Sequence, residues 1–97
     1  MMADDEADMN VALMVNGNAV AGRLQQIFGR DMTTAVARCA GCASDAEMGA
    51  LIAFTRGPGV VLRCPACQAA IARIVETPSA IYLEARGAAY LRVEPQP

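Results

Sequence analysis

The sequence predicts a small α+β domain that consists mainly of antiparallel β-strands, with one short helix near the N-terminus. Three observations lead to this prediction: an apolar stripe with helical spacing after residue 18, alternating apolar and polar residues in the C-terminal third, and two Cys-x-x-Cys pairs between these regions. A chain of 97 residues buries only about 60–65% of the surface that it exposes when unfolded. We therefore expect one domain with a thin core.

The N-terminal residues 1–15 are expected to form an acidic, solvated tail. Four acidic residues fall within the first eight positions, at Asp4, Asp5, Glu6 and Asp8. Residues at the end of a chain are poorly ordered unless the fold ties them down. We expect the folded domain to cover residues 16–97.

A short helix is expected over about residues 18–29. The sequence Asn16-Gly17-Asn18 is typical of a turn, and Asn18 is the predicted N-cap. One apolar face follows at helical spacing, formed by Val20, Leu24, Ile27 and Phe28. Gly29 is a typical terminator, because glycine readily adopts the left-handed conformation that often ends a helix.

Strands are expected on both sides of the first cysteine pair. Thr33–Arg38 has the composition of a strand that leads into that pair. Ala50–Thr55 and Val60–Arg63 flank the turn sequence Arg56-Gly57-Pro58-Gly59, which predicts a hairpin. This hairpin would return the chain from the first cysteine pair to the second.

A C-terminal β-meander is predicted over residues 70–94, where apolar and polar residues alternate. A two-residue loop in the first turn pairs Ile74 with Leu83. A three-residue loop in the second turn pairs Leu83 with Val93 and keeps one face of the sheet apolar. Residues 68–76 also fit a helical face, so strand and helix both remain open for this segment.

Two Cys-x-x-Cys turns, residues 39–42 and 64–67, are the strongest chemical signal in the chain. They contain all four cysteines, Cys39, Cys42, Cys64 and Cys67, and the chain has no histidine. Two thiolates three positions apart hold one side of a tetrahedral ion, and a second turn completes the shell. We predict one structural Zn²⁺ ion; a rubredoxin-like Fe site and dithiol redox chemistry are the alternatives. Because four thiolates leave no open position on the metal, we expect no enzymatic activity.

Residues next to the cysteines bear on the same prediction. Arg38 and Arg63 each stand directly before the first cysteine of a pair, and we expect them to offset the negative charge of four thiolates around a dication. Ala43 and Gln68 follow the second cysteines, where such turns commonly have glycine at positive φ. A non-glycine residue there costs on the order of 1 kcal/mol, which metal binding outweighs.

A second motif accompanies the cysteines. It comprises Gly17-Asn18-Ala19, Ala21-Gly22, Leu24, Phe28-Gly29, Met32-Thr33 and Thr77-Pro78. With these residues the chain resembles a family of short, uncharacterised bacterial proteins of unknown function that have a zinc-ribbon-like double Cys-x-x-Cys motif. The resemblance covers about residues 16–94, with Asn16 where aspartate is expected. It implies a small zinc-ribbon-like domain with a metal site, and no established activity.

Another protein is the partner that the sequence favours. The pI of about 4.9 disfavours nucleic acid, which usually requires a basic surface, so a nucleic-acid-binding zinc ribbon is the alternative. The predicted registers place arginine and tyrosine side chains around Glu84 on one exposed face. This candidate partner surface consists of Arg73, Tyr82, Arg86, Tyr90 and Arg92.

The sequence predicts a cytoplasmic location and no membrane contact. The start of the chain is acidic, and the apolar run Val11–Val15 is too short for a signal core or a membrane span. In a reducing compartment, paired cysteines more often bind metal than form disulfides.

Overall fold

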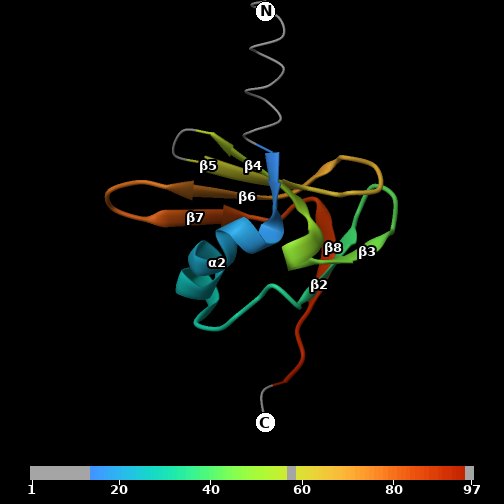
Figure 1. Cartoon of the computed structure of the whole chain (residues 1–97), viewed down its shortest axis with the longest axis horizontal. Helices are drawn as coiled ribbons and strands as arrows, with labels where there is room; N and C mark the ends of the chain where they lie inside the picture. The colour runs from blue at the N-terminus through green and yellow to red at the C-terminus, as the bar shows by residue number, and fades with distance from the viewer. Residues whose placement is uncertain (1–13, 57–58, 96–97) are drawn as a thin grey trace, which may run out of the picture.

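The computed structural model describes residues 14–56 and 59–95 of the chain (Figure 1). Its helices and strands are, in chain order, β1 (Met14–Asn16), the 3₁₀-helix η1 (Gly17–Val20), α2 (Ala21–Phe28), β2 (Val36–Cys39), β3 (Asp45–Glu47), the 3₁₀-helix η2 (Met48–Ala50), β4 (Ile52–Arg56), β5 (Gly59–Arg63), β6 (Ala70–Glu76), β7 (Ile81–Glu84) and β8 (Ala88–Arg92). The predicted small α+β domain with one N-terminal helix and antiparallel strands is confirmed.

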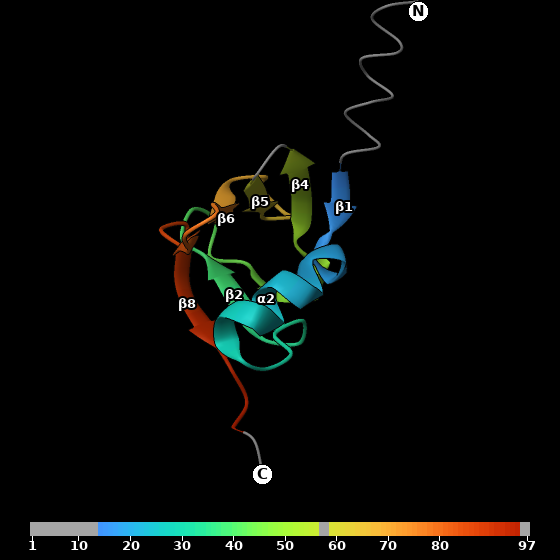
Figure 2. The ribbon, with the colours of Figure 1, turned by 90° about the vertical axis from the view of Figure 1, so that its left-hand side faces the viewer.

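The strands form two antiparallel sheets. The five-stranded sheet has the order β1-β4-β5-β6-β7, and the three-stranded sheet has the order β3-β2-β8. Figure 2 shows β4, β5 and β6 on one side of the molecule and α2, β2 and β8 on the other. Among the described residues, no helix has the length and apolar character that crossing a bilayer requires.

The helix lies where the apolar stripe predicts it, but its first turn differs. The chain enters through η1, continues as α2 and ends at Gly29, whose φ of 73° is left-handed and whose N–H donates to the Gln25 carbonyl. The predicted N-cap is wrong: Asn16 takes this place, and its side-chain oxygen accepts a hydrogen bond from the N–H of Asn18 at 3.1 Å. The side chain of Asn18 instead packs against Gly49, where an added Cβ would lie 2.4 Å from its oxygen.

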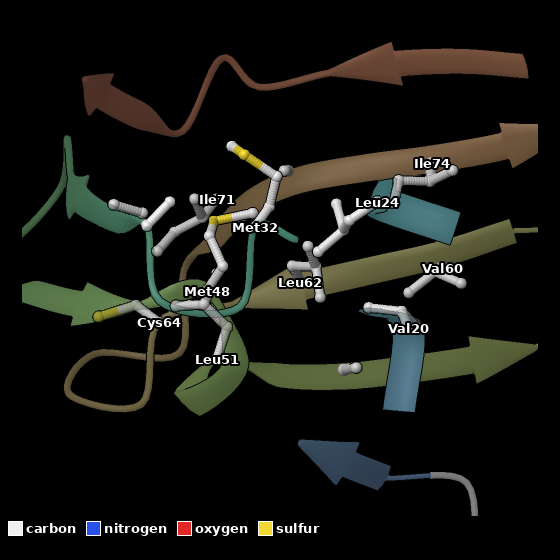
Figure 3. Packing of buried hydrophobic residues seen from close by; sticks show 14 of the residues in the cluster. Val20, Leu24, Met32, Met48, Leu51, Val60, Leu62, Cys64, Ile71 and Ile74 are labelled. Carbon is white, nitrogen blue, oxygen red and sulfur yellow. The ribbon is translucent and has the colours of Figure 1, made fainter. Parts of the chain in front are cut away.

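The core lies between one face of the five-stranded sheet and the layer that contains α2 and β2 (Figure 3). Val20 and Leu24 from the helical segment are buried together with Leu62 from β5 and Ile74 from β6. Burying each such side chain contributes about 1.5–3 kcal/mol. Alternate residues on β4, β5 and β6 point to the opposite face of the sheet and are only partly buried or exposed: Phe54, Val61, Arg63, Arg73 and Val75.

The strands around the first cysteine pair follow the prediction with shifted ends. β4 and β5 form the predicted hairpin. The strand before Cys39 begins at Val36 instead of Thr33, because Thr33 forms a turn in which its N–H and hydroxyl both donate to the Asp31 carboxylate. Met14 and Val15, predicted as part of the tail, form β1 with Asn16 and pair with β4. The remainder of the predicted tail, residues 1–13, lies outside the described residues.

The predicted meander is correct for its first two strands and wrong for its third. β6 and β7 pair with Ile74 opposite Leu83, as predicted, and the segment left open at residues 68–76 contains the strand β6. β8 pairs with β2 in the other sheet. The predicted pairing of Leu83 with Val93 therefore does not form.

The path of the chain at Gly87 explains this difference. The N–H of Gly87 donates to the Ile71 carbonyl in β6 at 3.1 Å, and its carbonyl accepts from the N–H of Ala40 at 2.8 Å. An added Cβ at Gly87 would lie 1.9 Å from the carbonyl oxygen of Ala70, so only glycine fits here. The turn thus leads the chain from β7 past β6 to the edge of β2, a strand edge that a purely local hairpin argument leaves out.

Candidate metal centre

The first cysteine turn, which we call knuckle 1 (residues 39–44), connects β2 to β3. The N–H of Cys39 donates to the Ser44 carbonyl at 2.9 Å, and the N–H of Ala43 donates to the Cys39 carbonyl at 2.9 Å. These two hydrogen bonds fold the turn back on itself, so that Cys39 and Cys42 reach the same cluster of sulfur atoms.

The second cysteine turn, knuckle 2 (residues 64–69), connects β5 to β6 and repeats this pattern. The N–H of Cys64 donates to the Ala69 carbonyl at 2.9 Å, and the N–H of Gln68 donates to the Cys64 carbonyl at 2.8 Å. The N–H of Ala66 also donates to the Cys64 sulfur at 3.3 Å. Two segments far apart in the chain therefore have equivalent main-chain hydrogen bonds.

Ala43 and Gln68 adopt the left-handed conformation that glycine commonly takes at these positions of a cysteine turn. Their φ angles are 63° and 66°, and they are the non-glycine residues with positive φ among those described. The cost is on the order of 1 kcal/mol at each position. Both knuckles keep the same geometry although neither has the favoured glycine.

The four sulfur atoms form a compact cluster. Cys39 and Cys67 Sγ lie 3.6 Å apart, Cys42 and Cys64 Sγ lie 3.7 Å apart, and all four Sγ atoms lie within 4.8 Å of one another. A tetrahedral zinc ion with Zn–S distances of ~2.3 Å has S–S distances of ~3.8 Å, whereas a disulfide bond is ~2.05 Å long. The cysteines are free thiols in a geometry that fits one tetrahedral ion.

An ion in this cluster would connect the two sheets. Knuckle 1 follows β2 of the three-stranded sheet, and knuckle 2 lies between two strands of the five-stranded sheet. Cys39 and Cys64 are each only 1% exposed, while Cys42 and Cys67 are exposed. The ion would therefore have two ligands in the core and two at the surface.

The thiols have different acidities. Hydrogen bonds from the Ser44 side chain and backbone lower the pKa of Cys42 to about 6. The backbone N–H of Ala69 lowers the pKa of Cys67, but the neighbouring thiols and partial desolvation outweigh it and raise that pKa to about 11. Cys42 therefore ionises more readily than Cys67, and a bound cation would favour the thiolate form at both positions.

The two arginines before the knuckles make different contacts. Arg38 donates to both carboxylate oxygens of Asp45, at 2.7 and 3.0 Å, and its guanidinium lies 5.1 Å from the centre of the Tyr90 ring. This contact holds the pKa of the Asp45 carboxyl below its usual range. Arg63 donates to the Gln68 carbonyl at 3.0 Å, within knuckle 2. Their effect on metal retention stays a prediction.

The candidate partner surface does not form one face. Arg73 and Tyr82 lie in β6 and β7 of the five-stranded sheet, and Arg86 follows β7. The other two members, Tyr90 and Arg92, lie in β8, which belongs to the three-stranded sheet. The single-face arrangement is wrong because it depended on pairing between β7 and β8.

A groove on the outer face of the five-stranded sheet was not predicted. It has a volume of about 590 Å³ and is lined by Phe54, Gly59, Val60, Val61, Arg63, Gln68, Arg73 and Val75. One signal in the sequence points to it. Apolar side chains occupy both faces of β4, β5 and β6, so that Phe54, Val61 and Val75 remain outside the core.

Comparison with known protein families gives a match for the chain. A profile described as a family of unknown function (DUF6510) matches residues 7–96. The chain belongs to this family. The resemblance to a family of unknown function with paired cysteines is confirmed, and the four cysteines form a possible metal site. No curated protein and no solved structure gave a match.

Proposed function

We propose that this protein is a non-catalytic module in which one structural zinc ion joins two sheets, and that it acts by binding a protein partner. One observation carries the first part: four Sγ atoms from two distant turns lie within 4.8 Å of one another. Four thiolates complete a tetrahedral shell and leave no position for a substrate or an activated water. Within the described residues, no other group of three or more cysteine, histidine or acidic side chains could share an ion.

Two observations support zinc over the alternatives. Rubredoxin-like iron sites are usually surrounded by aromatic side chains, but the buried core of the described residues has none. The two close sulfur–sulfur contacts join Cys39 to Cys67 and Cys42 to Cys64, across the knuckles. A dithiol redox motif instead cycles a disulfide within one Cys-x-x-Cys turn. The cross-knuckle arrangement suits one shared ion.

Metal analysis of the purified full chain tests the zinc centre. We expect one zinc ion per chain by mass spectrometry after purification under reducing conditions. Cys42→Ser and Cys67→Ser should each lower the zinc content, because three thiolates bind more weakly than four. Ser79→Ala, in the turn between β6 and β7, is the matched control and should retain zinc. A compact, ordered protein without bound metal would contradict the proposal.

Exposed arginine and tyrosine side chains support a protein partner. Tyr82 is 60% exposed, and the Arg73 side chain is 62% exposed at 3.8 Å from Glu84. Both residue types are enriched in protein interfaces. Affinity capture from the native host, with wild type and with Arg73→Ser combined with Tyr82→Ala, should identify a protein that only the wild type retains.

Arg23→Ser on α2 is the control for this capture and should retain the same protein. If the bound material is nucleic acid, its binding should fall steeply between low and high salt in a filter assay, because phosphate contacts release counterions. That result, or equal capture by all three proteins, would contradict a protein partner at this surface.

A further inference from the structure

The groove on the five-stranded sheet combines an apolar floor with two cationic side chains. Cross-strand pairing sets Phe54, Val61 and Arg73 in one row across β4, β5 and β6. Val75 and Arg63 also line the groove. The alternate residues of these strands are buried in the core on the other face of the sheet. Among the described residues no helix or strand covers this row, because α2 packs against the opposite face.

The chain enters the sheet beside this groove. β1 begins at Met14, which lies directly opposite Phe54 in the β1–β4 pair. Residues 1–13 therefore join the fold next to one wall of the groove. Neighbouring strands lie ~4.8 Å apart, so Arg73 on β6 lies three strands, or about 14 Å, from Met14 on β1. Four to five extended residues span this distance at ~3.3 Å per residue.

The composition of residues 1–13 complements the groove. This segment has four acidic side chains and no basic one, and apolar residues follow the acidic ones: Met9, Val11, Ala12 and Leu13. The rest of the chain is basic, since all eight arginines and only six acidic residues follow residue 8. Arg73 keeps hydrogen-bond donors free, because Glu84, its carboxylate neighbour among the described residues, lies 3.8 Å away.

We propose that residues 1–13 dock into this groove in cis, with acidic side chains at Arg63 and Arg73 and apolar side chains against Phe54, Val61 and Val75. Single surface ion pairs are weak and would not hold a separate peptide. A short tether, however, supplies an effective concentration of about millimolar, so a contact too weak in trans forms within one chain. This inference goes beyond the proposed function and requires no partner.

Photo-crosslinking in the full chain tests the docking. Met9 is replaced by benzoyl-phenylalanine, the dilute protein is irradiated at low salt, and the products are mapped by mass spectrometry. We expect monomeric products with crosslinks on the outer face of β4, β5 and β6. Arg73→Gln should lower their yield by about two- to fivefold, and 1 M NaCl should do the same because the Debye length falls to ~3 Å. Arg23→Gln, on α2 and outside the groove, is the matched control and should leave the yield unchanged.

NMR chemical shifts provide a second test that does not depend on the crosslinker. Replacing the four acidic residues together (D4N, D5N, E6Q and D8N) should shift the amide resonances of Val61, Arg73 and Val75 and leave those of α2 in place. Crosslinks elsewhere on the chain, crosslinked dimers, equal yields in the two arginine variants, or unshifted groove resonances would each overturn the proposal. These outcomes leave the zinc centre untouched, since metal binding does not enter the experiment. Partner binding is measured separately, by capture with the Arg73→Ser and Tyr82→Ala variant.

Discussion

The two cysteine knuckles share one backbone geometry but are flanked by strands of different length. Knuckle 2 connects β5, with five residues, to β6, with seven residues, inside the five-stranded sheet. Knuckle 1 connects β2, with four residues, to β3, with three residues. Because the longer strands provide more ladder hydrogen bonds and more buried side chains, knuckle 2 should keep its shape better without metal. A bound ion therefore mainly organises knuckle 1 and the small sheet around it.

The arginines that precede the two knuckles also make different contacts. Arg63 donates directly to a carbonyl of knuckle 2, whereas Arg38 is held by Asp45 and lies beside Tyr90. Knuckle 1 is tied to the rest of the fold through the Ala40–Gly87 hydrogen bond and through the pairing of Cys39 with Ala88 of β8. Equivalent turns thus depend on different parts of the molecule, and each difference can be tested.

Removing the metal is expected to have the largest effect. Structural zinc supplies an apparent ~10–16 kcal/mol in small domains, comparable to the whole stability of a chain of this size. After chelation, amides of residues 36–47 should lose protection from hydrogen exchange before those of residues 59–76. Exchange measured by NMR with and without chelator checks this order. Simultaneous loss of protection in both segments would contradict the proposed difference in stability between the two knuckles.

Gly87→Ala should have the next largest effect. The new Cβ would overlap the Ala70 carbonyl oxygen at 1.9 Å and displace the turn that holds Ala40 of knuckle 1. We expect a loss of about 3 kcal/mol in the free energy of unfolding, measured by urea titration of the metal-loaded protein. Gly22→Ala is the control, because open space surrounds this helical position and alanine should stabilise it by about 0.5–1 kcal/mol. Equal effects at the two glycines would contradict the close approach at Gly87.

Ala43→Gly and Gln68→Gly should each stabilise the metal-loaded protein slightly. Glycine relieves the cost of positive φ, on the order of 1 kcal/mol, but gains entropy in the unfolded chain, so the net benefit should stay below that value. Thermal unfolding of the two variants checks this. Similar gains in stability for the two variants would support equivalent backbone geometries in the two knuckles. A loss of stability at either position would mean that the side chain has a separate role there.

The arginines should give the smallest effects. Arg63→Gln should raise zinc loss to a competing chelator by a few-fold, less than the ~10–100-fold typical for direct partners of metal ligands. Arg38→Gln should change it less, because this arginine mainly contacts Asp45. A larger effect at Arg38, or no effect at either position, would contradict the contrast between the knuckles.

Local sequence signals predicted the local structure well. The apolar stripe from Val20 to Phe28, the β4–β5 hairpin and the pairing of Ile74 with Leu83 each depend on neighbouring residues, and the structure contains all three. Paired cysteine spacing likewise predicted the sulfur cluster, because four ligands in two turns have few other ways to share an ion.

Non-local choices were not predictable in the same way. β8 had two edges available, and the alternation of its residues fits either partner. The close backbone packing at Gly87 directs the chain toward β2, and a glycine in a turn is too common to indicate this from the sequence. The ion pair between Arg38 and Asp45 was not predicted for a related reason. Asp45 lies opposite Arg38 across knuckle 1, and this position depends on the register of β2 and β3.

The exposure of Cys42 and Cys67 has a consequence for how the ion would leave. Two of the four ligands are open to solvent, so a competing thiol or chelator can attack the ion in the folded protein. We expect release to accelerate in proportion to competitor concentration, as in associative ligand exchange, and not to level off at the rate of global unfolding. A centre of this kind would hold its metal firmly at equilibrium and still exchange it quickly with other thiolate carriers.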